Sequence, residues 1–234
     1  MNSEITKPID IAGILFMYFG FYLVMSNIGM MFLMTAFYIF INPEYFEFIY
    51  VFQFIIDIIT MISIVTFSRR SIKDGFKKGI NSDFFLNTLK FYAIFWITNI
   101  AVSLPISLMT GGEVSENQQA IEMMTGELPV YMFFSVVIFA PIVEELVFRV
   151  GVYGGMRKKF SVLVSVLVSA LSFAMMHMII SLLSGNFADL IFVVAYAVPG
   201  AILCLAYEKT DNILVPIMVH WINNLIAIFA ILLV

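Results

Sequence analysis

Long apolar segments separated by short polar stretches dominate the pattern of this chain. Most apolar segments reach roughly twenty residues, the length that a helix needs to cross the hydrocarbon core of a bilayer. The pattern predicts an all-α, polytopic transmembrane bundle of about seven helices, with six to eight allowed. The predicted spans are 11–41, 45–67, 84–109, 129–153, 161–183, 187–207 and 213–234.

The first apolar segment differs from the others in its length. It is far longer than the core of a signal peptide, and no small-residue cleavage site follows it, so we expect a retained anchor. A span of this length can tilt, include an interfacial piece or break near Ser26 and Asn27. We expect one membrane domain overall, in which N-terminal helices and loops (1–128) precede a helical core (129–234) that carries the chemistry.

Composition supports the membrane assignment. The chain has 62% hydrophobic and 12% charged residues and a mean hydropathy of +1.02, whereas soluble domains carry about 25% charged residues. The net charge of -4 comes mainly from loops and provides no basic stripe, which argues against nucleic acid as a partner. The single cysteine, Cys204, lies in an apolar segment and reads as a packing residue.

The charges between the spans predict how the bundle is oriented. Lys and Arg accumulate on the cytoplasmic side of membrane proteins, and here they cluster after the second span and in the turn at 157–159. The loop 111–128 carries four glutamates and no Lys or Arg, which suits the outer face. We therefore expect a cytoplasmic N-terminus, a cytoplasmic turn at 208–211 and a site that opens towards the cytoplasm.

Ionisable residues inside spans are costly and usually mark function. The fourth predicted span contains Glu144, Glu145 and Arg149, the fifth contains His177, and the last contains His220 and Asn224. The chain has no other histidine. All six residues lie in otherwise apolar sequence, so we expect one buried polar site built from three helices.

Helical spacing divides this set into roles. Glu145 and Arg149 are four residues apart and share a helix face, so we expect an ion pair, whereas Glu144 points about 100° away towards a cavity. Glu144 and His177 are equidistant from the basic turn between their helices, which predicts similar depths. His220 and Asn224 share one face of the last helix, and Asn223 competes with Asn224 for the same place.

Two chemistries use such a set. A carboxylate in a low-dielectric site can act as general base towards water, while imidazole and amide groups stabilise an oxyanion. Alternatively, Glu144, His177 and His220 can hold a divalent metal such as zinc, which would activate the water. The residues alone leave both open, because no His-Glu-x-x-His pair lies on a single helix, and we favour metal-free catalysis.

The three motifs, in this order, resemble those of the CPBP family (CAAX protease and bacteriocin-processing, also called Abi), which includes the type II CAAX prenyl endopeptidases. The motifs are Glu144-Glu145-x-x-x-Arg149, Phe173-x-x-x-His177 and His220-x-x-x-Asn224. The resemblance covers roughly residue 129 to the C-terminus. Each motif alone is weak, but the three together are specific.

The resemblance implies an intramembrane protease. In it, Glu144 activates water, His177, His220 and Asn224 complete the catalytic site, and Glu145 with Arg149 supports it. The implied partners are a membrane-associated protein or peptide substrate and the lipid bilayer, and we expect a bacterial plasma membrane. One departure is Val150, where the family often has glycine; Gly151 and Gly155 are expected to supply the close helix approach instead.

Other readings compete with the protease. The chain can be a non-catalytic interaction protein, such as a bacteriocin immunity factor or a modulator of a membrane sensor, or less plausibly a proton-coupled transporter, although it shows no paired halves. A buried salt-bridge cluster alone would leave one carboxylate without a cation. For Asp57 and Asp189, capping or interior hydrogen bonding is expected rather than catalysis, and Tyr196 is expected to shape the sixth helix.

Overall fold

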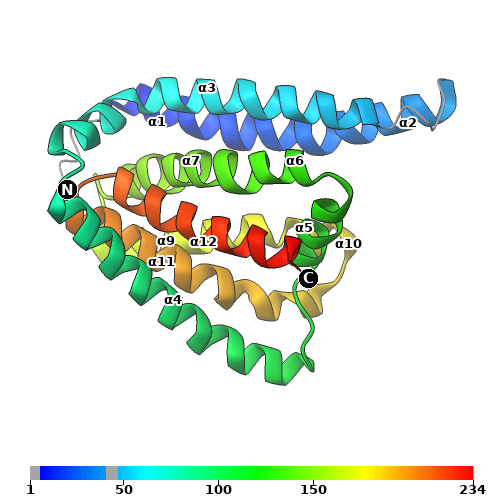
Figure 1. Cartoon of the computed structure of the whole chain (residues 1–234). Helices are drawn as coiled ribbons and strands as arrows, with labels where there is room; N and C mark the ends of the chain where they lie inside the picture. The colour runs from blue at the N-terminus through cyan, green and yellow to red at the C-terminus, as the bar shows by residue number, and fades with distance from the viewer. Residues whose placement is uncertain (1–5, 41–46, 234) are drawn as a thin grey trace.

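The computed structural model describes residues 6–40 and 47–233, and every regular element within these ranges is a helix (Figure 1). Six of the described helices are long and apolar enough to cross a membrane, and Val162–His177 is apolar but shorter. The predicted all-α transmembrane bundle is therefore confirmed, and the helix count falls within the predicted range. The predicted limits at residues 41, 45 and 234 lie outside the described residues.

Several spans are built from consecutive helical pieces, some of which have π-helical geometry. The first span joins α1, two π-helical segments and α2; the fourth joins α6, α7 and α8 through two more; the sixth starts with a 3₁₀ turn. The α-helices are α1 Pro8–Leu15, α2 Met30–Phe40, α3 Glu47–Lys78, α4 Ser82–Thr110, α5 Glu116–Glu127, α6 Pro129–Met132, α7 Ala140–Glu145, α8 Gly154–Met156, α9 Val162–His177, α10 Ile179–Ser184, α11 Val193–Thr210 and α12 Leu214–Leu232. The π-helical segments are Phe16–Tyr22, Met25–Gly29, Phe133–Phe139 and Leu146–Tyr153, and the 3₁₀ helix is Phe187–Phe192.

Two boundaries differ from the prediction, and one of the alternatives left open for the first span is excluded. The first span does not break near Ser26; it runs as one helical stretch, and its π-helical segment Met25–Gly29 takes up the irregularity. The fifth span is not continuous, because α9 ends at His177 and α10 follows Met178. The predicted turn at 208–211 is mostly helical, since α11 continues to Thr210 and only Asp211 adopts the left-handed conformation that ends it.

Figure 1 shows the bundle in layers. The first span and α3 lie side by side and cover the fourth span, beneath which lie α9, α11 and α12, while α4 crosses the outside obliquely and contacts α11 and α12. Turns at 79–81, 157–161 and 211–213 gather at one end, where α1 begins. The loop 111–128 with α5, together with α10, lies at the other end. We call these the basic end and the acidic end after their charges.

Glycines mark the places where the helices approach most closely. A Cβ added at Gly151 would lie 3.1 Å from Ile14, so this glycine lets α1 pack tightly on the fourth span as predicted, whereas at Gly155 the nearest atom of Ile11 would be 3.5 Å away, an ordinary contact. At Gly200, an added Cβ would lie 3.4 Å from the backbone of Ala170, which brings α11 against α9. These contacts fix the helices that carry the predicted site.

Candidate active site

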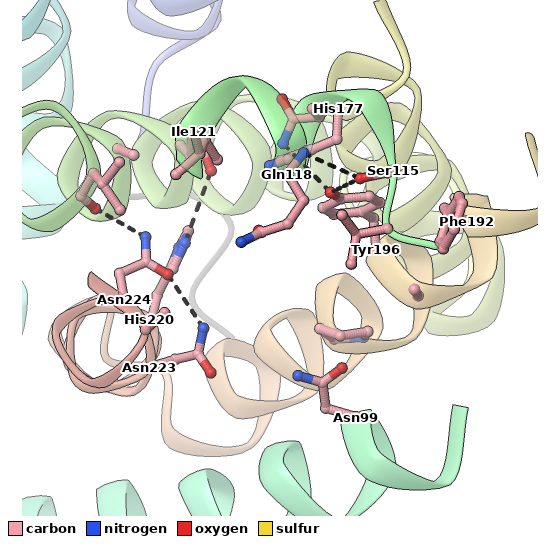
Figure 2. Close-up of a pocket in the computed structure, with 18 of the residues that line it drawn as sticks. Asn99, Ser115, Gln118, Ile121, His177, Phe192, Tyr196, His220, Asn223 and Asn224 are labelled. Carbon is pink, nitrogen blue, oxygen red and sulfur yellow. Dashed lines mark hydrogen bonds and ion pairs between the residues drawn. The ribbon is translucent and has the colours of Figure 1, made fainter. Parts of the chain in front are cut away.

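One cavity of about 570 Å³ brings the predicted site residues together. Glu144, His177, His220 and Asn224 all line it, from α7, α9 and α12. Figure 2 shows the last three of these residues around the cavity. Residues of α4, α5 and α11 complete its walls. Three segments far apart in the sequence therefore converge as the motif spacing predicts, although their chemical roles are not tested by their positions.

Glu145 and Arg149 form the buried base of this site. The Nε atom of Arg149 lies 2.8 Å from Oε2 of Glu145, and its Nη2 atom lies 3.1 Å from Oε1. Both side chains are fully buried. The arginine also lies over the ring of Phe173, 5.1 Å from its centroid. A two-point pair of this kind neutralises both charges where an isolated charge would be very costly.

His220 connects the buried pair to the cavity. Its Nδ1 atom lies 2.9 Å from Oε1 of Glu145, and its Nε2 atom lies 3.9 Å from Oε2 of Glu144. Because Arg149 holds Glu145 in its ionised form, Nδ1 is the donor of this hydrogen bond. The carboxylate thereby fixes the ring orientation and directs Nε2 towards Glu144 and the cavity.

Glu144 has no such partner. Its side chain is 16% exposed and lines the cavity, and its Oε2 atom is buried without a hydrogen bond within the described part of the chain. The adjacent Glu145 is fully buried and bonded to two groups. The helix thus places two neighbouring carboxylates in contrasting environments, as the spacing predicts, and leaves Glu144 available to bind a water or a substrate.

His177 approaches the cavity from the last turn of α9. Its Nδ1 atom lies 2.9 Å from the carbonyl oxygen of Phe173, which can only accept, so this nitrogen carries a proton. The imidazole stacks on Tyr196, with ring centroids 4.5 Å apart. Phe173 lies 4.5 Å from His177 and 6.1 Å from His220 between ring centroids, so it spaces the two histidines.

The two asparagines of α12 both line the cavity. Asn224 donates to the carbonyl oxygen of Val136 at 2.9 Å, and Asn223 donates to the side-chain oxygen of Asn224 at 3.2 Å (Figure 2). Asn224 therefore ties α12 to the fourth span, and Asn223 presents the rest of its amide to the cavity. The choice of Asn224 over Asn223 as a catalytic donor stays a prediction.

The sequence interpretation missed part of the cavity wall. Tyr196 does more than shape its helix, because its hydroxyl lies 2.7 Å from Oγ of Ser115 and accepts from Asn117 at 3.3 Å. This links His177 to the start of α5. Asn99 and Ser103 also line the cavity. Their spacing along α4 offered a signal, since they are four residues apart in an apolar helix.

The two remaining acids make interior hydrogen bonds, as predicted. Asp57 is fully buried and accepts from Gln53 at 2.7 Å and from Tyr131 at 3.1 Å. Asp189 accepts from Ser181 and from the backbone N–H of Glu116 at 3.3 Å, which caps the start of α5. Neither residue lines the cavity.

The donor set and the spacing disagree about a metal. In their neutral forms both histidines carry the proton on Nδ1, which leaves the Nε2 lone pairs available as ligands, and Glu144 supplies a carboxylate. Yet among residues 6–40 and 47–233 no three His, Cys, Asp or Glu side chains lie close enough to hold an ion. We therefore derive no step through a metal from this arrangement.

The cavity opens towards the end of the bundle opposite to the one expected. Its wall includes Gly112, Glu113 and Ser115 from the acidic end and Ser107 from the C-terminal half of α4, which we call the outer half of α4. None of the turns at the basic end lines it. The expected opening on the basic, cytoplasmic side is therefore wrong. The reason is that His177 lies in the last turn of α9, at the end of that helix that points away from the basic turn 157–161.

Comparisons with known proteins show what this chain is similar to. Residues 126–226 match the family model described as type II CAAX prenyl endopeptidase Rce1-like. The membrane-embedded CAAX protease MroQ of Staphylococcus aureus (strain USA300) is 30% identical over 140 residues, which are 57% of this chain and 52% of that protein. The predicted membrane peptidase YdiL of Bacillus subtilis (strain 168) is 26% identical over 167 residues, 71% of this chain and 64% of that protein.

These matches confirm the resemblance to CAAX proteases that the motifs indicate. The matched range includes all three motifs. The alignments span about half to two thirds of the length of the two relatives. No solved structure matches.

Proposed function

We propose that this protein is an intramembrane endopeptidase that hydrolyses a peptide bond of a membrane-associated protein or peptide. The observation that carries the proposal is the contrast between the two adjacent glutamates. Glu145 is neutralised by Arg149, whereas Glu144 faces the cavity with an oxygen that no described residue binds. The similarity of residues 126–226 to CAAX proteases supports the same activity.

The geometry suggests how hydrolysis proceeds. Glu144 removes a proton from a water whose oxygen attacks the carbonyl carbon of the scissile bond. The resulting oxyanion is stabilised by hydrogen-bond donors of the cavity, for which His177, His220 and Asn224 are the candidates. Glu144 then returns the proton to the leaving nitrogen as the carbon–nitrogen bond breaks, which yields a new carboxylate and a new amine.

The histidines constrain this scheme. Each uses its Nδ1 proton on a protein acceptor, so Nε2 donates to an oxyanion only when the ring is protonated. His220 has a carboxylate oxygen near each ring nitrogen, that of Glu145 at 2.9 Å and that of Glu144 at 3.9 Å. Alternatively, the Nε2 lone pairs of His177 and His220 and the carboxylate of Glu144 would bind a divalent metal such as zinc.

The test is cleavage by purified protein in detergent. Wild type and Glu144→Ala are incubated with a quenched-fluorescence peptide library that includes prenylated members, with and without a chelator. We expect cleavage by wild type alone, unaffected by the chelator. Loss of activity on chelation, restored by zinc, would favour the metal. If neither folded protein cleaves any peptide and the Glu144→Ala variant still complements in cells, a non-catalytic interaction protein would be favoured.

The cellular setting is part of the same proposal. We propose a bacterial plasma membrane with the N-terminus in the cytoplasm, because the basic turns lie at the end that carries the N-terminus. A reporter fused to the N-terminus that is active only in the cytoplasm tests this orientation, and activity of a reporter that works only outside the cytoplasm would contradict it.

A further inference from the structure

The distribution of charge and the direction of the cavity together identify the side from which substrate enters. Apart from the buried Arg149, every Lys and Arg of the chain lies at residue 7, in 69–90, in 157–159 or at 209, at or near the basic end. Such an asymmetry places that end in the cytoplasm. The cavity opens at the other end, beneath α5 and beside the outer half of α4.

The outer half of α4 carries a line of polar side chains along the cavity. Asn99, Ser103 and Ser107 recur every four residues, so they share one helix face, and all three line the cavity. Ser103 and Ser107 are exposed. Figure 2 shows Asn99 across the cavity from His177. Polar side chains at this depth face water or a polar partner rather than lipid.

Asn99 has hydrogen-bonding capacity left over. Its side-chain oxygen accepts from Ser103 at 3.0 Å, and no described residue accepts from the NH₂ group (Nδ2) of its side-chain amide. The preceding residue, Thr98, differs, because its hydroxyl donates to the carbonyl oxygen of Ile94 at 2.8 Å. The side-chain amide of Asn99 thus lines the cavity with an NH₂ group that no described residue binds, and the amides of Asn223 and Asn224 line the same cavity from α12.

We infer that the substrate is a peptide segment presented on the extracytoplasmic side, which enters between α4 and α12. Its extended backbone binds along Asn99, Ser103 and Ser107 and so reaches Glu144. An extended peptide exposes a carbonyl and an N–H at every residue, and an asparagine followed by serines offers both donors and acceptors to them. This inference rests on the proposed function and adds the side of access and the residues that position the substrate.

Cysteine labelling tests the side of access without using the activity. Cys204 is the only cysteine and is fully buried, so the wild-type chain should not react with a membrane-impermeant maleimide. Single variants Ser103→Cys and Ser107→Cys are labelled in intact cells, with Ser82→Cys, an exposed serine at the basic end of α4, as the matched control. We expect labelling of residues 103 and 107 from outside, and of residue 82 only after permeabilisation. The reverse pattern would overturn the inference.

Kinetics test the role of the polar line. With a peptide that wild type cleaves, Asn99→Ala should raise KM about fivefold, the effect of one hydrogen bond, and leave kcat nearly unchanged. Asn87→Ala is the matched control, because Asn87 is equally half-buried on α4 but lies near the basic end. An unchanged KM in Asn99→Ala would overturn the substrate-binding role.

The two experiments separate this inference from the proposed function. If wild type cleaves no peptide while residues 103 and 107 are labelled from outside, the proposed protease fails but the outward opening stands. If wild type cleaves peptides and labelling occurs only from inside, the protease stands and the inferred access fails.

Discussion

The site divides into a buried base, formed by Glu145, Arg149 and His220, and a cavity rim, formed by Glu144, His177 and Asn99. In the base, charges are matched and Glu145 binds both Arg149 and His220, and the Nη1 atom of Arg149 is the one buried side-chain atom of these three residues that no described residue binds. In the rim, Glu144 and Asn99 keep polar atoms that no described residue binds. The comparison separates residues that hold the structure from residues positioned to act on something that enters from outside.

Removing one charge of the base is the largest perturbation that we expect. Arg149→Met leaves Glu145 as an uncompensated buried carboxylate, which should destabilise the fold by about 3–5 kcal/mol and greatly reduce the yield of folded protein. Thermal unfolding in detergent measures the effect. The double variant Arg149→Met with Glu145→Gln should recover much of the loss, and a single variant as stable as wild type would show that the pair does not hold the base.

The contact of the fourth span with α1 gives the next largest effect. Gly151→Ala forces a methyl group to within 3.1 Å of Ile14 and should cost about 1–3 kcal/mol. Gly155→Ala is the control, because its added Cβ would meet Ile11 at 3.5 Å without strain. Equal unfolding midpoints for both variants would contradict the assignment of Gly151 as the close contact.

The rim should respond more in activity than in stability. Tyr196→Phe keeps the ring that stacks on His177 but removes the hydroxyl that binds Ser115 and Asn117. Each lost hydrogen bond is worth about 1 kcal/mol of stability, so we expect a modest drop in the unfolding midpoint together with a several-fold loss of cleavage, because the ring stacked on His177 loses its link to α5. Tyr196→Ala, which also removes the stacking, should be clearly less active, and equal rates for the two variants would argue against positioning of His177 by the ring.

A buried acid outside both regions should matter least. Asp57→Asn retains a side-chain oxygen that can accept from Gln53 and a group that can bind Tyr131, so both interior contacts can persist. Cleavage by this variant should stay within about twofold of wild type, since Asp57 does not line the cavity. A large loss of cleavage would extend the functional site to α3.

The sequence predicted the base better than the rim. The four-residue spacing of Glu145 and Arg149 was sufficient to predict their pairing, because a single helix determines it. The convergence of His177 and His220 followed from their motifs and from a hairpin geometry that holds for straight helices. The four-residue spacing of Asn99 and Ser103 indicates a polar face on α4, but which cavity that face lines depends on tertiary packing between helices, as does the stacking of Tyr196 on His177.

The direction of the cavity shows why the rest was missed. The basic turns lie together at one end of the bundle, but depth along the fourth span could not be counted from sequence, because that span contains π-helical segments. π-helical geometry changes the rise and rotation per residue, so equal numbers of residues no longer give equal depths.

The most direct test of the account compares the two neighbouring glutamates by substituting each with the neutral isostere. Cleavage rates and unfolding midpoints are measured for wild type, Glu144→Gln and Glu145→Gln at equal amounts of folded protein. We predict that Glu144→Gln loses cleavage by about 10²–10⁴-fold and has the unfolding midpoint of wild type. Glu145→Gln, in contrast, should have a lowered unfolding midpoint, because Arg149 loses its buried counter-charge. A Glu144→Gln protein that cleaves at the wild-type rate would contradict the central claim that this carboxylate activates the water.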